Sequence, residues 1–111
     1  MSIIDINAEQ LKSYLEQGGV VVLLIWIKRC DQCAKFKPVF QQLPEFYSDI
    51  TFLRMNMFET MENLRLAEQY EKEQTPIIPI FCGGEHLGTF VGYYSFEDFR
   101  AKFDEIVKEN C

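Results

Sequence analysis

The sequence predicts an α/β fold in which a mixed β-sheet carries helices on both faces. Segments with the apolar pattern of strands alternate with segments of helical periodicity, in the order β-α-β-α-β-α. Residues Val20–Ile27 are apolar throughout, which is typical of a strand buried on both faces. A Gly83-Gly84 pair between two later strand-like segments is typical of a hairpin.

The chain begins with a short strand-like segment, Ile3–Ile6, followed by a helix. Asn7 can cap that helix, and Gln10 stands three residues further on, as in a capping box. Gly18-Gly19 is expected to end the helix.

The middle of the chain supplies the expected central strand and the longest kinked helix. We expect Val20–Ile27 to take a central, parallel position in the sheet. The next helix is expected over Cys30–Tyr47. Pro38 lies inside this helical pattern and should kink it, and Pro44 should kink or end it.

The remaining elements are one strand–helix–strand unit, a further strand joined to it by the Gly83-Gly84 hairpin, and a final helix. We expect strands at Ile50–Met57, Ile77–Cys82 and Leu87–Val91, and a helix at Glu59–Tyr70. Ser95 is expected to cap the last helix. The apolar residues of that helix form one stripe: Phe96, Phe99, Phe103, Ile106 and Val107.

Length and charge restrict the class of protein. The 111 residues are enough for a single domain with its own core, so we expect one domain over residues 1–111. The formal net charge of −6 argues against nucleic acid as a partner. The longest apolar run is too short to span a bilayer, and the N-terminus lacks a signal-peptide pattern. We therefore expect a soluble cytoplasmic protein without a membrane partner.

The chemistry is expected at Cys30-Asp31-Gln32-Cys33, between the central strand and the start of a helix. A helix N-terminus stabilises a thiolate, and two intervening residues leave the second thiol one turn away. One thiol can attack a disulfide and the other can release the mixed disulfide. Half of a zinc site and two inert thiols are the alternatives, but the strand-to-helix context favours redox chemistry.

Several landmarks lie at fixed spacings around the two cysteines. A Trp precedes the first cysteine by four residues, a proline follows the second by five, and a Thr-Pro step precedes a glycine hairpin. In chain order the landmark residues are Trp26, Cys30, Cys33, Pro38, Arg54, Thr75, Pro76, Gly84 and Gly92. Together they resemble the thioredoxin family over nearly the whole chain, which implies a thioredoxin fold with a mixed five-stranded sheet and about four helices.

The resemblance also implies roles for individual residues. Cys30 would be the nucleophile and Cys33 the resolving thiol, joined as a redox-active disulfide when oxidised. The Thr75-Pro76 bond would be cis, with the Thr75 backbone exposed to pair with a substrate segment. Three further residues would bind substrate or tune the site: Trp26, Gln32 and Gly92.

The active-site segment departs from the usual Trp-Cys-Gly-Pro-Cys of the family. Arg29 should favour a thiolate on Cys30 and Asp31 should disfavour it, and the sequence leaves the net effect open. Leu24 replaces a buried Asp that is credited with helping the resolving cysteine lose its proton. The chain is therefore interpreted as a divergent thioredoxin-like protein.

Two functions remain open at this point. The favoured one is a dithiol–disulfide oxidoreductase acting on protein substrates, with no cofactor or metal and with a thioredoxin reductase as a candidate electron donor. The alternative is a thioredoxin-fold binding module whose thiols contribute little.

The two other cysteines, Cys82 and Cys111, are interpreted as bystander thiols. We expect a monomer that oxidation can link into a dimer through Cys111, because the polar end of the last helix should be mobile. A zinc site from Cys30, Cys33, Cys82 and His86 has a suitable composition but a spacing that fits no common finger.

Overall fold

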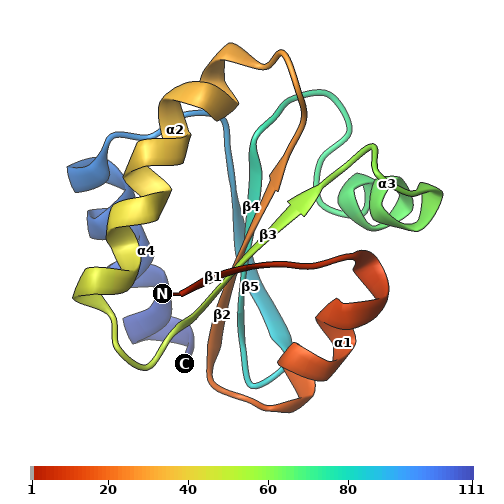
Figure 1. Cartoon of the computed structure of the whole chain (residues 1–111). Helices are drawn as coiled ribbons and strands as arrows, with labels where there is room; N and C mark the ends of the chain where they lie inside the picture. Colours follow the sequence, from red (N-terminus) through yellow and green to blue (C-terminus); the bar gives the residue numbers. More distant parts are fainter. Residues whose placement is uncertain (1) are drawn as a thin grey trace.

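The computed structural model describes residues 2–111, and in that range a five-stranded sheet lies between two layers of helices (Figure 1). The strands are β1 (Ile3–Asp5), β2 (Val20–Trp26), β3 (Thr51–Asn56), β4 (Ile77–Cys82) and β5 (Glu85–Val91). The helices are α1 (Ala8–Glu16), α2 (Asp31–Gln42), the 3₁₀ helix η1 (Leu43–Phe46), α3 (Met61–Glu68) and α4 (Phe96–Asn110). None of the helices in this range is long and apolar enough to cross a bilayer.

The sheet has the order β1-β3-β2-β4-β5, so β2 is its central strand. β2 runs parallel to β3 and antiparallel to β4, and residues Val21–Ile25 are buried. The continuous apolar run thus has the predicted central position. One of its two neighbours is antiparallel, because β4 enters the sheet from the opposite end.

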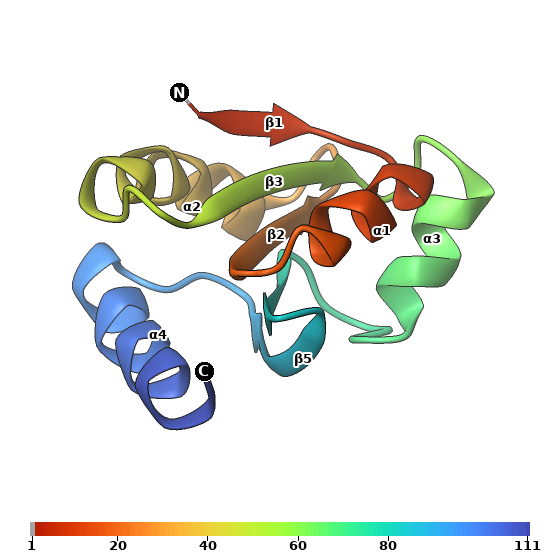
Figure 2. The same cartoon turned by 90° about the horizontal axis from the view of Figure 1, so that it is seen from below.

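Helices cover both faces of the sheet, as the element order predicts. α2 and α4 lie on one face, and α1 and α3 lie on the other (Figures 1 and 2). Alternate residues of β2 point to opposite layers: Leu24 packs in the α2/α4 core, and Leu23 packs in the α1/α3 core. This alternation places Leu24 on the same side of the sheet as α2.

The helix after the central strand ends earlier than the pattern predicts. Pro38 lies inside α2, and the regular helix stops at Gln42. The 3₁₀ helix η1 follows and has Pro44 near its start. Pro44 lacks an N–H and crowds the preceding turn, which accounts for the change in helix type.

One polar side chain in the core joins three elements and was not predicted. Asn63 in α3 is fully buried, whereas the neighbouring apolar Met61 is exposed. The side-chain oxygen Oδ1 of Asn63 accepts a hydrogen bond from the Ala8 N–H at 2.7 Å. The side-chain nitrogen Nδ2 donates one to the backbone carbonyl of Asn56 at 2.9 Å. Both halves of the buried amide are therefore satisfied, and they tie the start of α1 to the end of β3.

We predict that Asn63→Asp lowers the free energy of unfolding by roughly 2–4 kcal/mol at neutral pH, because a carboxylate cannot donate to Asn56 and is buried. Burial raises the pKa of the introduced carboxyl group, so the loss should grow as pH rises from about 4 to about 8. Denaturant unfolding at both pH values measures this. The exposed control Asn110→Asp should change stability by less than about 0.5 kcal/mol, and an equal loss in both variants would contradict the role of Asn63.

Candidate active site

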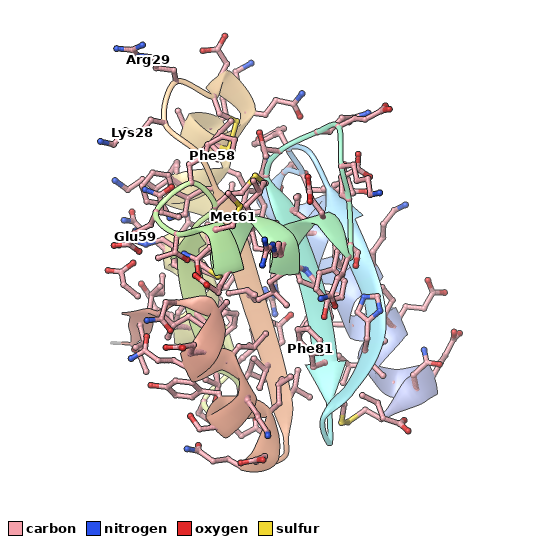
Figure 3. All side chains as sticks on the ribbon, turned by 90° about the vertical axis from the view of Figure 1, so that its right-hand side faces the viewer. Lys28, Arg29, Phe58, Glu59, Met61 and Phe81 are labelled. Atoms are coloured by element: carbon pink, nitrogen blue, oxygen red, sulfur yellow. A yellow bond between two sulfur atoms is a disulfide. The ribbon has the colours of Figure 1, made fainter. Side chains whose placement is uncertain are left out.

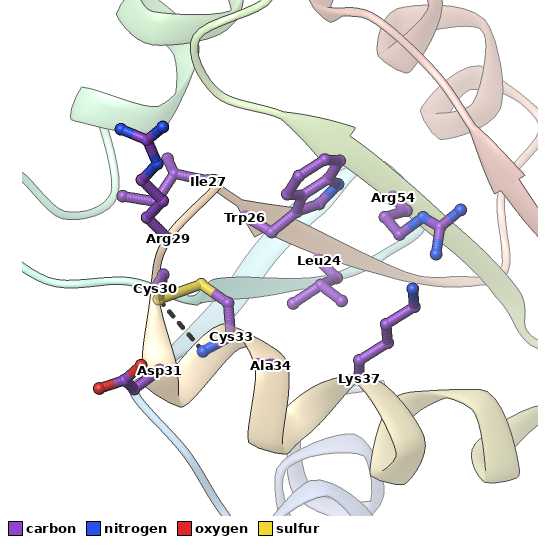
Figure 4. A pocket seen from close by; sticks show the side chains of 10 residues that line it. All are labelled: Leu24, Trp26, Ile27, Arg29, Cys30, Asp31, Cys33, Ala34, Lys37 and Arg54. Atoms are coloured by element: carbon purple, nitrogen blue, oxygen red, sulfur yellow. Dashed lines mark hydrogen bonds between the residues drawn. A yellow bond between two sulfur atoms is a disulfide. The ribbon is translucent and has the colours of Figure 1, made fainter.

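The two cysteines of the Cys-x-x-Cys segment form a disulfide at the start of α2, directly after the central strand (Figure 4). Their Cα atoms are 5.2 Å apart. Cys30 is half-buried, whereas Cys33 is only 8% exposed. An incoming substrate can therefore reach the Cys30 sulfur more easily than the Cys33 sulfur.

The Cys30 sulfur also caps α2. Its Sγ atom accepts a hydrogen bond from the Cys33 N–H at 3.1 Å, and the Cys30 backbone has the extended conformation of an N-cap residue. The N–H groups and the partial positive charge of the helix end stabilise negative charge on that sulfur. When the disulfide is reduced, this position favours a thiolate on Cys30.

The loop before β4 lies against the same sulfur. The Thr75-Pro76 bond is cis, as its register with the family's X-Pro step predicts. Thr75 Oγ1 is 3.2 Å and its carbonyl oxygen 3.7 Å from Cys30 Sγ. A disulfide sulfur has no proton, so here the Thr75 hydroxyl is the donor. In the reduced protein the same hydroxyl can donate to a thiolate.

A third loop, after β5, completes the cluster. The Gly92 N–H donates to the Pro76 carbonyl at 2.9 Å, and the Tyr93 N–H donates to Gln32 Oε1 at 2.8 Å. A Cβ atom on Gly92 would lie 2.8 Å from Gln32 Oε1, and the φ of Gly92 is +85°. Glycine is therefore strongly favoured here, and the Gln32 side chain connects the first turn of α2 to this loop.

The charged neighbours Arg29 and Asp31 are both exposed, on either side of Cys30. Arg29 has a φ of +59°, in the left-handed region that non-glycine residues rarely adopt. The chain thus turns sharply between β2 and α2, and Cys30 follows at the helix cap. The opposing effects of the two charges on a Cys30 thiolate stay a prediction.

A cavity of about 400 Å³ opens beside the disulfide (Figure 4). Leu24 lies on its wall and is 3% exposed, next to Trp26 at the end of β2. Within residues 2–111, the buried Trp26 Nε1 has no hydrogen-bond partner. The other lining residues are Ile27, Arg29, Cys30, Asp31, Cys33, Ala34, Lys37 and Arg54.

No buried carboxyl group of the described chain lines this cavity, since Asp31 is exposed. Cations occupy the far wall instead. Arg54 is paired with Asp5 at 2.7 Å, and this hydrogen bond lowers the pKa of the Asp5 carboxyl. The lining therefore contains no buried carboxylate near Cys33, and the effect of Leu24 on deprotonation of Cys33 stays a prediction.

The structure separates the four residues of the zinc alternative. Cys82 and His86 lie on β4 and β5 at the end of the sheet away from Cys30 and Cys33. No cluster of three or more ligand-type residues suited to a metal occurs in residues 2–111.

Cys111 was expected to be an unpaired bystander thiol, and the structure instead gives it a partner within the chain; a dimer linked through Cys111 on oxidation stays a prediction. Cys111 forms an intramolecular disulfide with Cys82, with Cα atoms 5.9 Å apart. The prediction judged Cys111 by its polar neighbours, but the helical phase of α4 turns this residue toward the sheet.

The comparisons with known proteins agree with this geometry. The family model described as Thioredoxin matches residues 2–105. Thioredoxin H5 of Oryza sativa subsp. japonica is 29% identical over 96 residues, covering 86% of this chain and 68% of that protein. Thioredoxin 1 of Synechococcus elongatus is 32% identical over 79 residues, covering 70% of this chain and 71% of that protein.

Solved structures show the same fold. Spinach chloroplast thioredoxin F (short form) superposes with a TM-score of 0.80 at 20% identity, covering 99% of this chain and 95% of that one. Reduced Schistosoma mansoni thioredoxin pre-protein gives 0.77 at 24% identity, with both chains fully covered. Fold and site together define a thiol–disulfide exchange protein. The chain belongs to the thioredoxin family.

We predict that Leu24→Asp speeds insulin reduction near neutral pH, because a carboxylate beside Cys33 can accept the proton of the resolving thiol. The same change should lower stability by about 1–3 kcal/mol if the carboxyl group stays unpaired. Insulin turbidity with dithiothreitol and denaturant unfolding measure the two effects. Leu24→Asn is the matched control, with similar destabilisation but no gain in rate. A folded Leu24→Asp protein without faster reduction would show that Cys33 finds its base elsewhere.

We predict that Thr75→Val slows alkylation of reduced Cys30 by iodoacetamide several-fold near pH 7, because the thiolate loses a hydroxyl donor. Thr75→Ser keeps the hydroxyl and should react at nearly the wild-type rate. Mass spectrometry of the Cys30 peptide over time measures both. Equal rates in the two variants would mean that the hydroxyl does not stabilise the thiolate.

Proposed function

We propose that this protein is a protein-disulfide oxidoreductase that exchanges disulfides through Cys30 and Cys33. The observation that carries the proposal is the position of the Cys30 sulfur. It caps α2, is bonded to Cys33, and lies 3.2 Å from the Thr75 hydroxyl at a partly open surface. The Cys30 sulfur is therefore stabilised as a thiolate, has a resolving thiol beside it and is open to a substrate.

The reaction follows from this arrangement. In the reduced protein the Cys30 thiolate attacks one sulfur of a substrate disulfide, a mixed disulfide forms, and the other substrate sulfur leaves as a thiolate. The Cys33 thiolate then attacks Cys30 Sγ and releases the second substrate sulfur. Two electrons pass from the cysteine pair to the substrate, and its two sulfurs take up two protons. The reverse sequence oxidises a substrate dithiol.

The loops around the disulfide are suited to an extended substrate segment. The Thr75 backbone lies beside Cys30, and the loop after β5 is held next to it by the hydrogen bond from the Gly92 N–H to the Pro76 carbonyl. An extended peptide can add main-chain hydrogen bonds there, in the manner of strand addition. Trp26 completes the adjoining wall of the cavity.

Charge near the site favours acidic substrates. Residues 28–37 contain four cations, Lys28, Arg29, Lys35 and Lys37, and one carboxylate, in a chain of net charge −6. All five side chains are exposed. Phe58 and Met61 are exposed on the same side as Lys28 and Arg29 (Figure 3). A partner with acidic and apolar residues near its disulfide complements this surface.

We predict that a disulfide peptide with acidic flanks is reduced faster than the same peptide with basic flanks, because the cations attract it. Added salt should narrow the difference, since exposed charges are screened. Stopped-flow rates at low and high ionic strength measure this. Equal rates at low salt would contradict an electrostatic preference.

We also predict that Cys33→Ser traps a substrate on Cys30 as a stable mixed disulfide, because the resolving thiol is missing. Cys30→Ser should trap none, since Cys33 is buried. Non-reducing electrophoresis and peptide mapping after incubation with an oxidised protein substrate measure this. Equal trapping by both variants would contradict the assignment of Cys30 as the nucleophile and Cys33 as the resolving thiol.

The trapping experiment and an insulin-reduction assay together decide between an enzyme and a binding module. A binding module would retain its partner without a covalent link and would not accelerate insulin reduction by dithiothreitol. As further parts of the proposal, the physiological electron donor is a thioredoxin reductase and the location is the cytoplasm.

A further inference from the structure

We propose that Cys82 and Cys111 are a second redox-active dithiol, which a low-molecular-weight disulfide oxidises to an intramolecular bond that staples the end of α4 to the end of β4. This site is independent of the function proposed for Cys30 and Cys33.

The strand phase turns Cys82 toward α4. In β4, Ile78 and Ile80 pack in the core under α2 and α4, whereas Phe81 packs in the opposite core. Since successive side chains of a strand alternate, Cys82 faces the same side as Ile78 and Ile80.

The helix phase turns Cys111 toward the sheet. Phe99, Phe103 and Val107 follow one another at intervals of four residues and pack on the same core. Cys111 is the next member of this row. Its N–H donates to the Val107 carbonyl at 3.0 Å, so helical hydrogen bonding extends to Cys111 and fixes its position.

Close packing brings the two residues together. A Cβ atom on Gly88 of β5 would be 3.9 Å from Ile106 Cδ1, so the last turns of α4 lie directly on the β4–β5 hairpin. The Cys82 and Cys111 Cα atoms are 5.9 Å apart, within the usual range for a disulfide. Figure 3 shows the corresponding yellow bond beside the β4–β5 turn.

The second pair is remote from the active site. Cys82 pairs with Val20 at the start of β2, whereas Trp26, at the end of the same strand, lines the active-site cavity. Six strand steps separate the two ends, on the order of 20 Å. The Cys30–Cys33 disulfide of the same molecule therefore cannot exchange with Cys82 or Cys111, and an external reagent is required.

Accessibility makes the pair suited to exchange with such a reagent. Cys111 is exposed and Cys82 is half-buried. The Cys111 thiolate attacks one sulfur of glutathione disulfide, and one glutathione leaves as a thiolate. The Cys82 thiolate then attacks Cys111 Sγ and releases the second glutathione. Two electrons pass from the two cysteines to glutathione disulfide, and the two thiol protons end on two glutathione thiols.

The bond closes a loop between residues 29 positions apart in sequence. Such a crosslink restricts the unfolded chain and holds the last turn of α4 on the sheet. The oxidised form should therefore unfold at a higher temperature than the reduced form, whereas turnover at Cys30 should stay unchanged.

The test uses full-length Cys30→Ser/Cys33→Ser protein, which isolates the second pair. The reduced protein is equilibrated at low concentration in glutathione buffers of increasing oxidised fraction. Samples are quenched with acid and alkylated with N-ethylmaleimide, and the mass of the protein is measured by mass spectrometry. We expect both thiols to disappear together, with the loss of two hydrogens, in a monomer that yields one Cys82–Cys111 crosslinked peptide. The midpoint of unfolding should rise by several degrees on oxidation.

The matched control adds Cys111→Ser to this variant. It should form no species lacking two hydrogens, and its melting temperature should not respond to the oxidant. Separate glutathione adducts on the two cysteines, a disulfide-linked dimer, or a pair that stays reduced in every buffer would overturn the proposal. Equal melting temperatures of the oxidised and reduced forms would show that the disulfide does not stabilise the attachment of α4 to β4.

Discussion

The hydrogen bond from the Cys33 N–H to the Cys30 sulfur is the interaction on which the active site depends. It makes the reactive atom part of the helix cap, so the sulfur experiences the field of α2. Its position is in turn fixed by β2, which is buried on both faces at the centre of the sheet. The sharp turn at Arg29 leaves little freedom between strand and helix.

The mixed direction of the strands explains why three distant loops meet at this sulfur. β4 runs antiparallel to β2, so the Thr75-Pro76 step before β4 lies at the edge where β2 ends. β5 runs back again, and Gly92 after it returns to the same edge. The same topology sends the end of β4 to the opposite edge, where the α4 helix terminates. The alternating directions of β2, β4 and β5 therefore place the two cysteine pairs at opposite ends of the sheet.

Most of the fold follows from local signals in the sequence. The caps at Asn7 and Ser95, the apolar run of β2 and the glycine hairpin each depend on neighbours within a few residues, and the structure contains all of them. Apart from the Thr75-Pro76 step and Gly92, which the family resemblance implied, features that depend on distant partners were not predicted. The buried position of Asn63 depends on its hydrogen bonds to α1 and β3. The contact of Gln32 with the Tyr93 N–H depends on where β5 ends. The Cys82–Cys111 pairing could have been predicted, because the helix and strand phases place both residues on the same face of the sheet. The polar residues before Cys111 led instead to the expectation of an unpaired thiol.

The function proposed for this protein requires Cys30 and Cys33 to form a reversible two-electron couple, so the equilibrium potential of this pair is the decisive measurement. The measurement uses Cys82→Ser/Cys111→Ser protein in glutathione and dithiothreitol buffers, with acid quenching, alkylation and mass spectrometry. We expect one two-electron transition between roughly −120 and −300 mV, the range of catalytic dithiol couples. A pair that stays oxidised or stays reduced across that whole range, or that exchanges only after the protein unfolds, would contradict it.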